Sequence, residues 1–238
     1  METRDLAYDV YRDLLVGSGE DAVVVVPDYH GVTPYARAQA EAFAATSGRL
    51  GVVLDLYGDQ GMPATGADAF AAINPMMTDR QLGLKRLQAC VDQLHGQGVK
   101  RITLIGSSCG GTMVYDAART GMNVDGVIGV FGLFDPLENL PLVMRSVPDR
   151  KVPVLALVGS DDELVTRENY LPFIQELTAI GIDWQLHVHG GAKHAYTLRQ
   201  EDNLEVQSGE EPALQLFNEL ANRRTERLID QFLGEIFN

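Results

Sequence analysis

Residues 104–112, with the sequence LIGSSCGGT, carry the clearest chemical signal in the chain. Gly106, Ser108 and Gly110 form a G-x-S-x-G pattern, which an apolar run precedes and a helical pattern follows. In this strand–turn–helix context the pattern is typical of a nucleophile elbow, where a serine stands on a tight turn and glycines let strand and helix approach. The alternatives are a glycine-rich turn without chemistry and a phosphate-binding turn, but neither a P-loop Lys nor G-x-G-x-x-G is present. We therefore predict that Ser108 is a nucleophile.

A serine hydroxyl needs a base, because alone it is barely nucleophilic. The chain has five histidines: His30, His95, His187, His189 and His194. His194 follows the last expected strand and His30 follows the first central one, so both should lie at the edge of the sheet that carries the elbow. His95 is expected at the surface near a helix end, while His187 and His189 share one strand face. We predict His194 as the base, with His30 as the main competitor.

The base in turn needs an acid that fixes its tautomer and stabilises the imidazolium. Residues 158–163, VGSDDE, follow an expected strand and offer Asp161, Asp162 and Glu163. The resulting chain order is nucleophile, acid, histidine, as in serine hydrolases with this type of elbow. Spacing alone does not separate Asp161 from Asp162, and at least two of the three carboxylates must belong to a capping or solvated turn.

The backbone should supply an oxyanion hole beside Ser108. One donor is expected to be the N–H of Cys109, the residue after the nucleophile, and the other the N–H of Tyr29 in the loop 27–31. The thiol of Cys109 is a second possible nucleophile, but its side chain should turn away from the substrate. Cys90 falls on an apolar helix face and is expected in the core.

Apolar runs rich in β-branched residues predict the strands that position these groups. They lie at residues 22–26, 51–54, 102–105, 124–130, 152–158 and 184–188. Runs that are apolar on both faces suit a parallel sheet covered by helices, and helical patterns lie between them. We expect an α/β fold, a doubly wound and mostly parallel sheet flanked by helices, that forms one domain over residues 1–238.

The expected helices have recognisable starts. Thr78 with Gln81 resembles a capping box ahead of one helix, Thr166 can cap another, and residues 214–236 carry a C-terminal helical stripe. Three stretches are expected to be long loops: 57–77, 132–150 and 190–211. Each follows an expected strand, so all three should lie at the carboxyl edge of the sheet, where ligands bind.

The first two of these loops should roof a mostly apolar pocket beside Ser108. They offer Tyr57, Met62, Phe70, Met76, Met77, Leu133, Phe134 and Met144. In this interpretation the substrate carries a bulky apolar or aromatic body, and flexible methionines adapt to its shape. The alternative is that these side chains fill a satellite core beneath the loops.

The composition excludes several classes of partner. The net charge is −14, which disfavours nucleic acid and anionic membranes, since both need a basic footprint. Neither a secretory signal nor an apolar run of membrane-spanning length is seen, so a cytoplasmic enzyme with a small-molecule substrate is expected. Two cysteines form no disulfide or zinc pattern, and no residue pattern indicates a metal, a cofactor or an oligomeric state.

From about Val23 onward the chain resembles the dienelactone hydrolase family of the α/β-hydrolase superfamily. VVVPDYHGVTPYARAQAEAFA, LDLYGD, GSSCGG, VGSDDELV, GGAKHAYT and the final helical segment carry the resemblance, and GSSCGG and GGAKHAYT are its most specific parts. The resemblance implies an α/β-hydrolase fold and hydrolysis of an ester or lactone. It also implies that Asp162 is the acid, because Gly159 to Asp162 match a family G-x-x-D segment.

Two departures from the family pattern change the expected mechanism. The family nucleophile is usually cysteine, where this chain has Ser108, and Asp28 stands where a glutamate is usual near the oxyanion loop. A conventional serine esterase mechanism follows. Arg80 and Arg199 are the candidates for binding a substrate carboxylate, and Asp28 and His30 are further candidate pocket residues. The alternatives are acyl transfer or lactone cyclisation on the same elbow, and a non-catalytic binding protein of this fold.

Overall fold

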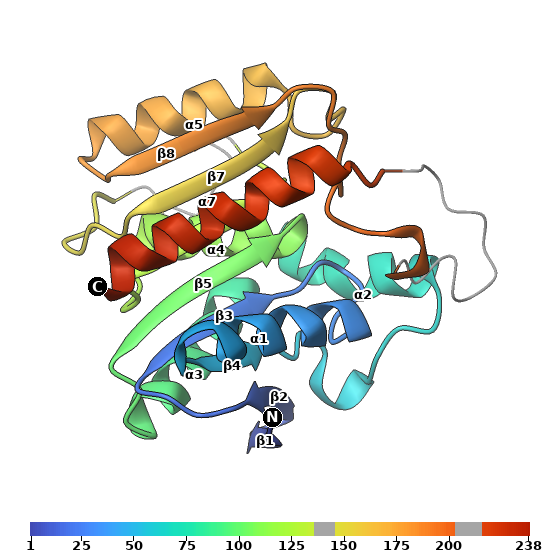
Figure 1. Cartoon of the computed structure of the whole chain (residues 1–238), viewed down its shortest axis with the longest axis vertical. Helices are drawn as coiled ribbons and strands as arrows, with labels where there is room; N and C mark the ends of the chain where they lie inside the picture. The colour runs from blue at the N-terminus through green and yellow to red at the C-terminus, as the bar shows by residue number, and fades with distance from the viewer. Residues whose placement is uncertain (136–145, 203–215) are drawn as a thin grey trace.

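The computed structural model describes residues 1–135, 146–202 and 216–238 (Figure 1). Eight strands form one sheet in the order β1-β2-β4-β3-β5-β6-β7-β8. Their bounds are β1 Thr3–Tyr8, β2 Tyr11–Val16, β3 Asp21–Val26, β4 Leu50–Val53, β5 Arg101–Ser107, β6 Gly126–Val130, β7 Val154–Gly159 and β8 Trp184–His189. The pairs β1–β2 and β2–β4 are antiparallel, and every other pair is parallel.

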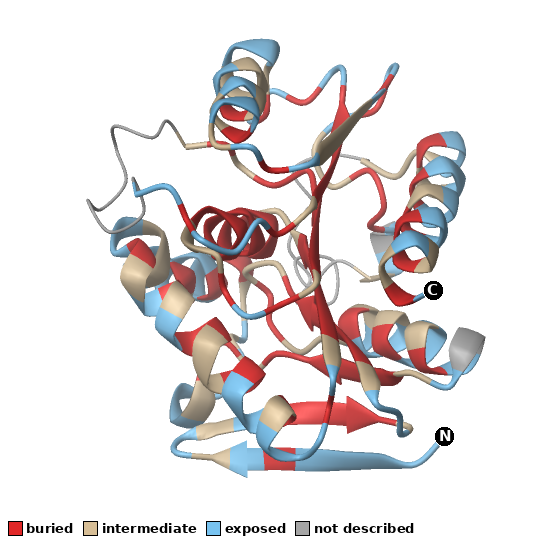
Figure 2. Cartoon of the chain, turned by 90° about the vertical axis from the view of Figure 1, so that its left-hand side faces the viewer, coloured by how far each residue is buried: buried red, intermediate tan, exposed pale blue. Residues whose placement is uncertain are grey.

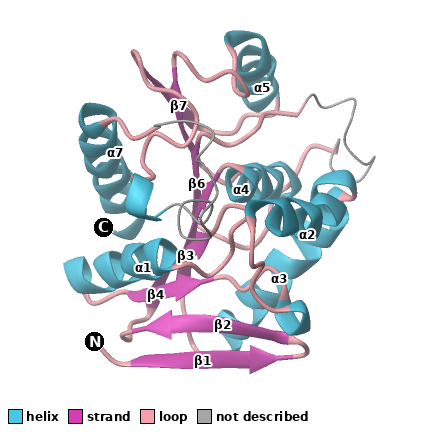
Figure 3. Ribbon diagram, turned by 90° about the vertical axis from the view of Figure 1, so that its right-hand side faces the viewer, coloured by secondary structure: helices cyan, strands magenta, loops and turns pink. Residues whose placement is uncertain are grey.

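Helices cover both faces of the sheet, as Figure 3 shows. One face carries α1 (Pro34–Ser47) and α7 (Glu219–Phe237), and the other carries α2 (Gly66–Thr78), α3 (Arg80–Gly96), α4 (Cys109–Thr120) and α5 (Arg167–Ala179). Each face therefore has its own apolar core. Burial is greatest in the central strands and in α4, whose residues are buried from Cys109 to Arg119 (Figure 2).

The central strands form because their residues are apolar on both faces. In β3 every residue from Ala22 to Val26 is buried, and the side chains alternate between the two cores. The six strands expected from such runs are all present, with ends that differ by two residues or fewer. The carboxyl ends of the parallel strands β3, β5, β7 and β8 consequently share one edge of the sheet.

The N-terminal hairpin of β1 and β2 is an element that the sequence patterns did not predict. Leu6 is the one buried residue of β1, so this edge strand lacks the continuous apolar run of a parallel strand. The buried carboxylate of Asp13 anchors the hairpin instead, because it accepts hydrogen bonds from Tyr8 and Arg86 and one of 2.8 Å from the backbone N–H of Asp55. In the sequence, a charged residue such as Asp13 is more typical of a loop than of a buried strand.

The expectation of a loop at residues 57–77 is wrong for most of its length. A short 3₁₀ turn, Gly58–Gln60, is followed by α2, which Thr65 caps by accepting a 3.1 Å hydrogen bond from the N–H of Asp68. Glycine and proline in this stretch suggested a loop, but Pro75 lies in the last turn of the helix. The apolar residues Ala69 and Ile73, one turn apart and both buried, were the helical signal.

The structure confirms some of the expected helix ends and shifts others. Helix α3 starts one residue later than expected. Its N-cap is Asp79, not Thr78, and the Asp79 side chain accepts a hydrogen bond of 3.1 Å from the N–H of Gln81. Thr166 does cap α5, with Asn169 closing the capping box at 2.9 Å. The C-terminal helix begins at Glu219, later than the stripe suggested. Of the expected loops 132–150 and 190–211, residues 136–145 and 203–211 lie outside the described residues.

Within the described ranges, no helix combines the length and the apolar character that crossing a membrane requires.

Candidate active site

Ser108 stands on a strained turn between β5 and α4. Its backbone has φ 51° and ψ −119°, a conformation that non-glycine residues rarely adopt. The flanking glycines are required by close backbone contacts. A Cβ atom on Gly106 would lie 2.2 Å from the carbonyl oxygen of Gly110, and a Cβ on Gly110 would lie 2.2 Å from that of Val26. The turn therefore has the geometry of a nucleophile elbow at the carboxyl edge of the sheet.

The side chains of Ser108, His194 and Asp162 form one hydrogen-bonded line. Ser108 Oγ lies 3.0 Å from His194 Nε2, and His194 Nδ1 lies 2.9 Å from Asp162 Oδ2. A carboxylate accepts the Nδ1 proton, which leaves the lone pair of Nε2 directed at the serine hydroxyl. The Asp162 side chain is fully buried, whereas 17% of the His194 side chain is exposed. The line thus runs from the interior to an accessible serine.

Backbone N–H groups of the turn that follows Asp162 fix the position of its carboxylate. Its Oδ1 accepts hydrogen bonds from the N–H groups of Leu164 at 2.8 Å and Val165 at 3.0 Å, so Oδ2 is left for the imidazole. Asp161 is exposed and accepts a 2.7 Å bond from Ser160 Oγ instead. Glu163 is also exposed. Among the three carboxylates that spacing left open, Asp162 is the one that contacts His194.

The loop that carries His194 is packed tightly against its neighbours. A Cβ on Gly159, at the end of β7, would lie 2.1 Å from the carbonyl oxygen of Ala192, so the acid turn and the histidine loop touch. Phe131 packs its ring edge against the imidazole with centroids 5.1 Å apart. Phe131 and Ala195 both have positive φ, 42° and 54°. Strained backbone therefore clusters around the imidazole, as it often does at functional sites.

The loop expected to supply the second oxyanion donor lies beside the start of α4. A Cβ on Gly110 would lie 2.4 Å from the carbonyl oxygen of Pro27, so the loop 27–31 and the first turn of α4 are in contact. Cys109 is the first residue of α4, where backbone N–H groups lack intrahelical partners. The carbonyl of Tyr29 accepts a hydrogen bond from the hydroxyl of Tyr57. The loop that carries Tyr29 thus lies against the first turn of α4, which begins at Cys109.

Cys109 is poorly suited to act as the nucleophile itself. Its side chain is buried, and burial raises the pKa of the thiol well above its usual range, with the nearby Asp28 carboxylate adding to the shift. A protonated thiol is a weak nucleophile.

His30, the competing base, is engaged elsewhere. Its Nδ1 lies 3.0 Å from Asp28 Oδ1, which also accepts 2.8 Å from the backbone N–H of His30. Its Nε2 is buried without a hydrogen-bond partner among the described residues. Asp28 therefore bonds within its own loop, and the described contacts of Ser108 Oγ include His194 but not His30.

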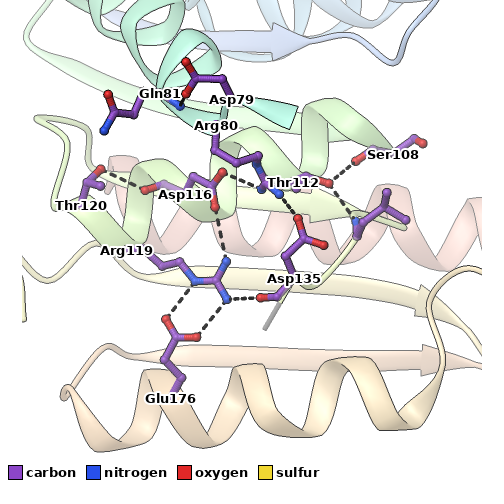
Figure 4. Close-up of polar contacts among 11 residues, drawn as sticks. Asp79, Arg80, Gln81, Ser108, Thr112, Asp116, Arg119, Thr120, Asp135 and Glu176 are labelled. Atoms are coloured by element: carbon purple, nitrogen blue, oxygen red, sulfur yellow. Dashed lines mark hydrogen bonds and ion pairs between the residues drawn. The ribbon is translucent and has the colours of Figure 1, made fainter. Parts of the chain in front are cut away.

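Several side chains expected in the pocket are instead packed or paired. Phe134 stacks on Tyr115 with ring centroids 4.8 Å apart and belongs to the core. Arg80 is buried and bonds to Asp116 at 2.6 Å and to Asp135 (Figure 4). The same Asp116 accepts from Arg119, which holds Glu176 at 2.8 Å, so Arg80 belongs to a buried ionic network.

The remaining pocket candidates lie in different surroundings. Met76 and Met77 are partly buried against the core, and Leu133 is partly buried near the elbow. Met62 and Phe70 are 47% and 67% exposed. Arg199 is exposed over the ring of Phe217, 4.5 Å from its centroid, and lines a cavity of about 410 Å³ between α1 and α7. Met144 lies outside the described residues.

Thr112 is a supporting residue that the sequence patterns did not single out. Its hydroxyl donates a hydrogen bond of 3.2 Å to the carbonyl of Ser108 and accepts one of 3.0 Å from the N–H of Leu133. Thr112 therefore joins the elbow to the loop after β6 (Figure 4). Its position one helical turn after the nucleophile was the available signal. Among the described residues, no three His, Cys, Asp or Glu side chains lie together as a metal site would require.

Comparisons with known proteins agree with this architecture. The family model of the dienelactone hydrolase family matches residues 14–232. A dienelactone hydrolase-like promiscuous phosphotriesterase from metagenomic libraries superimposes with a TM-score of 0.82 at 22% identity, over 99% of this chain and 98% of its own. The protein m3DLH gives 0.84 at 23% identity, over 100% and 99%. A thermophilic esterase from Thermogutta terrifontis, in its propionate-bound form, gives 0.62 at 17% identity, over 98% and 94%.

A search of curated proteins found no match to the chain. The mixed, mostly parallel sheet with helices on both faces is an α/β-hydrolase fold, as the structural neighbours also show. The family match spans nearly the whole sequence, from the second strand into the last helix. The chain therefore belongs to the dienelactone hydrolase family and is a hydrolase of the α/β type.

Proposed function

We propose that the chain hydrolyses carboxylic esters or lactones with Ser108 as nucleophile, His194 as general base and Asp162 as the acid that orients it. The observation that carries this proposal is the hydrogen-bonded line from Ser108 Oγ to His194 Nε2, at 3.0 Å, and from His194 Nδ1 to Asp162, at 2.9 Å. Both distances suit proton transfer and tautomer control without movement of the backbone.

In the first half-reaction Ser108 Oγ forms a bond to the carbonyl carbon as its proton passes to His194 Nε2. The carbonyl oxygen becomes an oxyanion, which the N–H groups of Tyr29 and Cys109 stabilise. The tetrahedral intermediate then collapses. The bond to the leaving alkoxide breaks, His194 returns its proton to that oxygen, and an acyl-enzyme ester on Ser108 remains. Asp162 stabilises the imidazolium throughout and stays ionised.

In the second half-reaction water takes the place of the serine hydroxyl. His194 accepts a proton from the water as its oxygen attacks the acyl carbon, and then donates it to Ser108 Oγ as the acyl bond breaks. The products are a carboxylic acid and the restored serine. For a lactone, the alcohol and the acid are parts of one product molecule.

The contacts of Asp28 are consistent with a serine nucleophile in place of the usual cysteine. This carboxylate bonds to the imidazole and the backbone N–H of His30, so it is satisfied inside its own loop. A serine needs only a neutral base to be activated, and His194 supplies it. The single-base arrangement supports a conventional serine esterase rather than a thiol enzyme.

The charges near the site favour an uncharged substrate. The guanidinium of Arg80 already faces two carboxylates, Asp116 and Asp135. A substrate carboxylate would have to displace Asp135 and would gain little, because the charge of Arg80 is already balanced. We therefore propose neutral esters or lactones as the preferred class.

Ser108→Ala tests the proposal with Cys109→Ala as its matched neighbour. We expect Ser108→Ala to lose turnover of p-nitrophenyl esters by about 10⁴-fold or more, because only binding and the oxyanion donors remain. Cys109→Ala keeps the backbone N–H and should remain active. A folded Ser108→Ala enzyme with near-normal turnover, or a folded but inactive Cys109→Ala enzyme, would contradict the assignment.

A further inference from the structure

A second polar groove lies between β8 and α7, away from the Ser108 line. β8 is the last strand of the sheet and pairs on one side with β7. In Figure 1, α7 runs in front of the sheet next to β7. The groove has a volume of about 360 Å³. Its lining residues are His187, Val188, His189, Arg224, Arg227, Leu228 and Gln231.

The periodicity of the helix and that of the strand each place polar side chains on the side that faces this groove. Arg224, Arg227 and Gln231 follow the i, i+3, i+7 spacing of one helical face. His187 and His189 are two residues apart, so they share one face of β8. That face is turned toward α7, because His189 Nε2 lies 3.1 Å from Thr225 Oγ1 on the helix.

The charge of the groove contrasts with that of the whole chain. The net charge is −14, yet no carboxylate is among the lining residues. In the described part of the chain, Arg224 and Arg227 make no ion pair, whereas their neighbour Arg223 lies 3.7 Å from Glu219.

Three acidic residues of α7 have places outside the lining of the groove. Glu226 and Asp230 line the separate cavity toward α1. Glu235, one turn beyond Gln231, accepts hydrogen bonds from the amide of Gln231 at 3.0 Å and from that of Gln185 at 3.1 Å. The part of α7 that faces β8 is therefore cationic at Arg224 and Arg227, and Glu235 lies beyond its Gln231 end, where the amides of Gln231 and Gln185 hold its carboxylate.

The electrostatics of His189 report the same cationic surroundings. Burial lowers the pKa of His189, and the neighbouring His187 and Arg224 lower it further. Cationic groups that converge in a partly desolvated groove repel one another, and a bound anion would remove this repulsion.

We propose that this groove binds a small tetrahedral oxyanion, either free phosphate or the phosphate group of a monoester. Arg224 and Arg227 supply charge-assisted hydrogen bonds to its oxygens, which guanidinium groups are well shaped to make. A ring N–H of His187 adds a further donor. His189 lines the inner wall, held in place by Thr225.

The test is a titration of the full chain with inorganic phosphate, and separately with phenyl phosphate, at constant ionic strength set by chloride. The readout is the histidine ring proton signals in NMR spectra. We expect saturable shifts for His187 and His189. His95, whose ring nitrogens lie 2.9 and 3.1 Å from the carbonyls of Val99 and Asn123, should not shift. Tighter binding of phenyl phosphate would assign the monoester, and equal or weaker binding would assign the free ion.

Arg224→Gln and Arg227→Gln provide the matched variants. Each removes one charged donor at an exposed helical position, and we expect each to weaken binding about tenfold, as loss of a charged hydrogen bond does. Arg223→Gln removes the same charge from the next residue of the helix and should leave binding unchanged. The proposal is overturned if neither phosphate gives saturable shifts, or if Arg223→Gln weakens binding as much as Arg224→Gln.

Discussion

The hydroxyl of Tyr57 donates a hydrogen bond to the backbone carbonyl of Tyr29, the residue whose N–H we propose as an oxyanion donor. Asp55 fixes Tyr57 in turn, since one carboxylate oxygen accepts from the N–H groups of Tyr57 and Gly58 at 3.0 Å each. The Tyr57 ring also packs so closely that a Cβ on Gly31 would lie 3.1 Å from it. Tyr57 was expected to line the pocket, but it is 4% exposed and braces the oxyanion loop.

Tyr57→Phe should therefore lower kcat and leave KM nearly unchanged. The ring remains, and the substitution removes only the hydrogen bond that fixes the carbonyl of Tyr29, and through it the backbone that carries the Tyr29 N–H. We expect a decrease in kcat of about three- to tenfold, the size of one neutral hydrogen bond. Steady-state kinetics on a p-nitrophenyl ester measure the effect on kcat and KM separately. Tyr170→Phe is the control, because Tyr170 lies on α5 and packs its ring against Phe134. A rise in KM at constant kcat would mean that Tyr57 contacts substrate instead.

Asp162→Asn should cripple turnover while the fold survives. An amide at this position leaves the wrong tautomer facing Ser108, and the analogous change in serine proteases costs about 10⁴-fold. Asp161→Asn is the matched control, because Asp161 bonds to Ser160 rather than to His194. Activity assays and circular dichroism of both variants provide the comparison. An inactive Asp161→Asn beside an active Asp162→Asn would reverse the choice of acid.

The two buried thiols should resist alkylation in the native chain. Burial raises the pKa of Cys90 and of Cys109 well above the usual thiol range, so both stay protonated. Iodoacetamide reacts with thiolates. We expect no adduct on the folded protein at pH 8, and two adducts after unfolding in urea, as measured by intact-protein mass.

The raised pKa values of the two thiols also make the free energy of unfolding depend on pH in the alkaline range. A thiol pKa that is higher in the folded than in the unfolded state favours folding while both states are protonated. This contribution is complete below the unfolded thiol pKa of about 8.5 and is lost progressively as the pH rises above it. Urea unfolding should therefore show a steeper loss of stability above this pH for the wild type than for Cys109→Ala. Equal slopes would contradict the raised pKa of Cys109.

Arg80→Met should destabilise the protein rather than change its preference among substrates. The substitution leaves the carboxylate of Asp116 buried beside Arg119 alone, and breaking one partner of a buried pair costs about 3 kcal/mol or more. Urea unfolding measures the loss, and Asp135→Asn, at the 42% exposed end of the network, should cost far less. A strong preference for an anionic lactone that disappears in Arg80→Met would restore a carboxylate-binding role.

The geometry of the candidate site was more predictable from the sequence than that of its surroundings, for physical reasons. An elbow needs glycines at fixed positions around the serine, because backbone atoms come within 2.2 Å of where their Cβ atoms would be. The histidine and acid turns follow strands whose apolar runs are unmistakable. Choosing Asp162 from spacing was impossible, since the preference comes from which carboxylate the backbone N–H groups of Leu164 and Val165 hold.

The pocket expectation is wrong for Phe134 and Arg80, whose residue types each have two common uses. Phe134 suits a substrate pocket and a core equally well, and its contacts with Tyr115 and Phe173 decide for the core. An arginine such as Arg80 suits a substrate carboxylate, but Asp116 and Asp135, which are distant in sequence, pair with it instead. Long-range pairing of this kind leaves no local pattern in the sequence.

Labelling with a fluorophosphonate tests the nucleophile most directly. The reagent phosphonylates an activated serine with loss of fluoride, and the modified residue can be located by peptide mass spectrometry. We predict one adduct per chain, on Ser108, with loss of esterase activity in step with labelling. The adduct should be absent from Ser108→Ala and strongly slowed in His194→Ala. An active wild-type enzyme that stays unlabelled, or an adduct on any other residue that accounts for the lost activity, would contradict the assignment of Ser108.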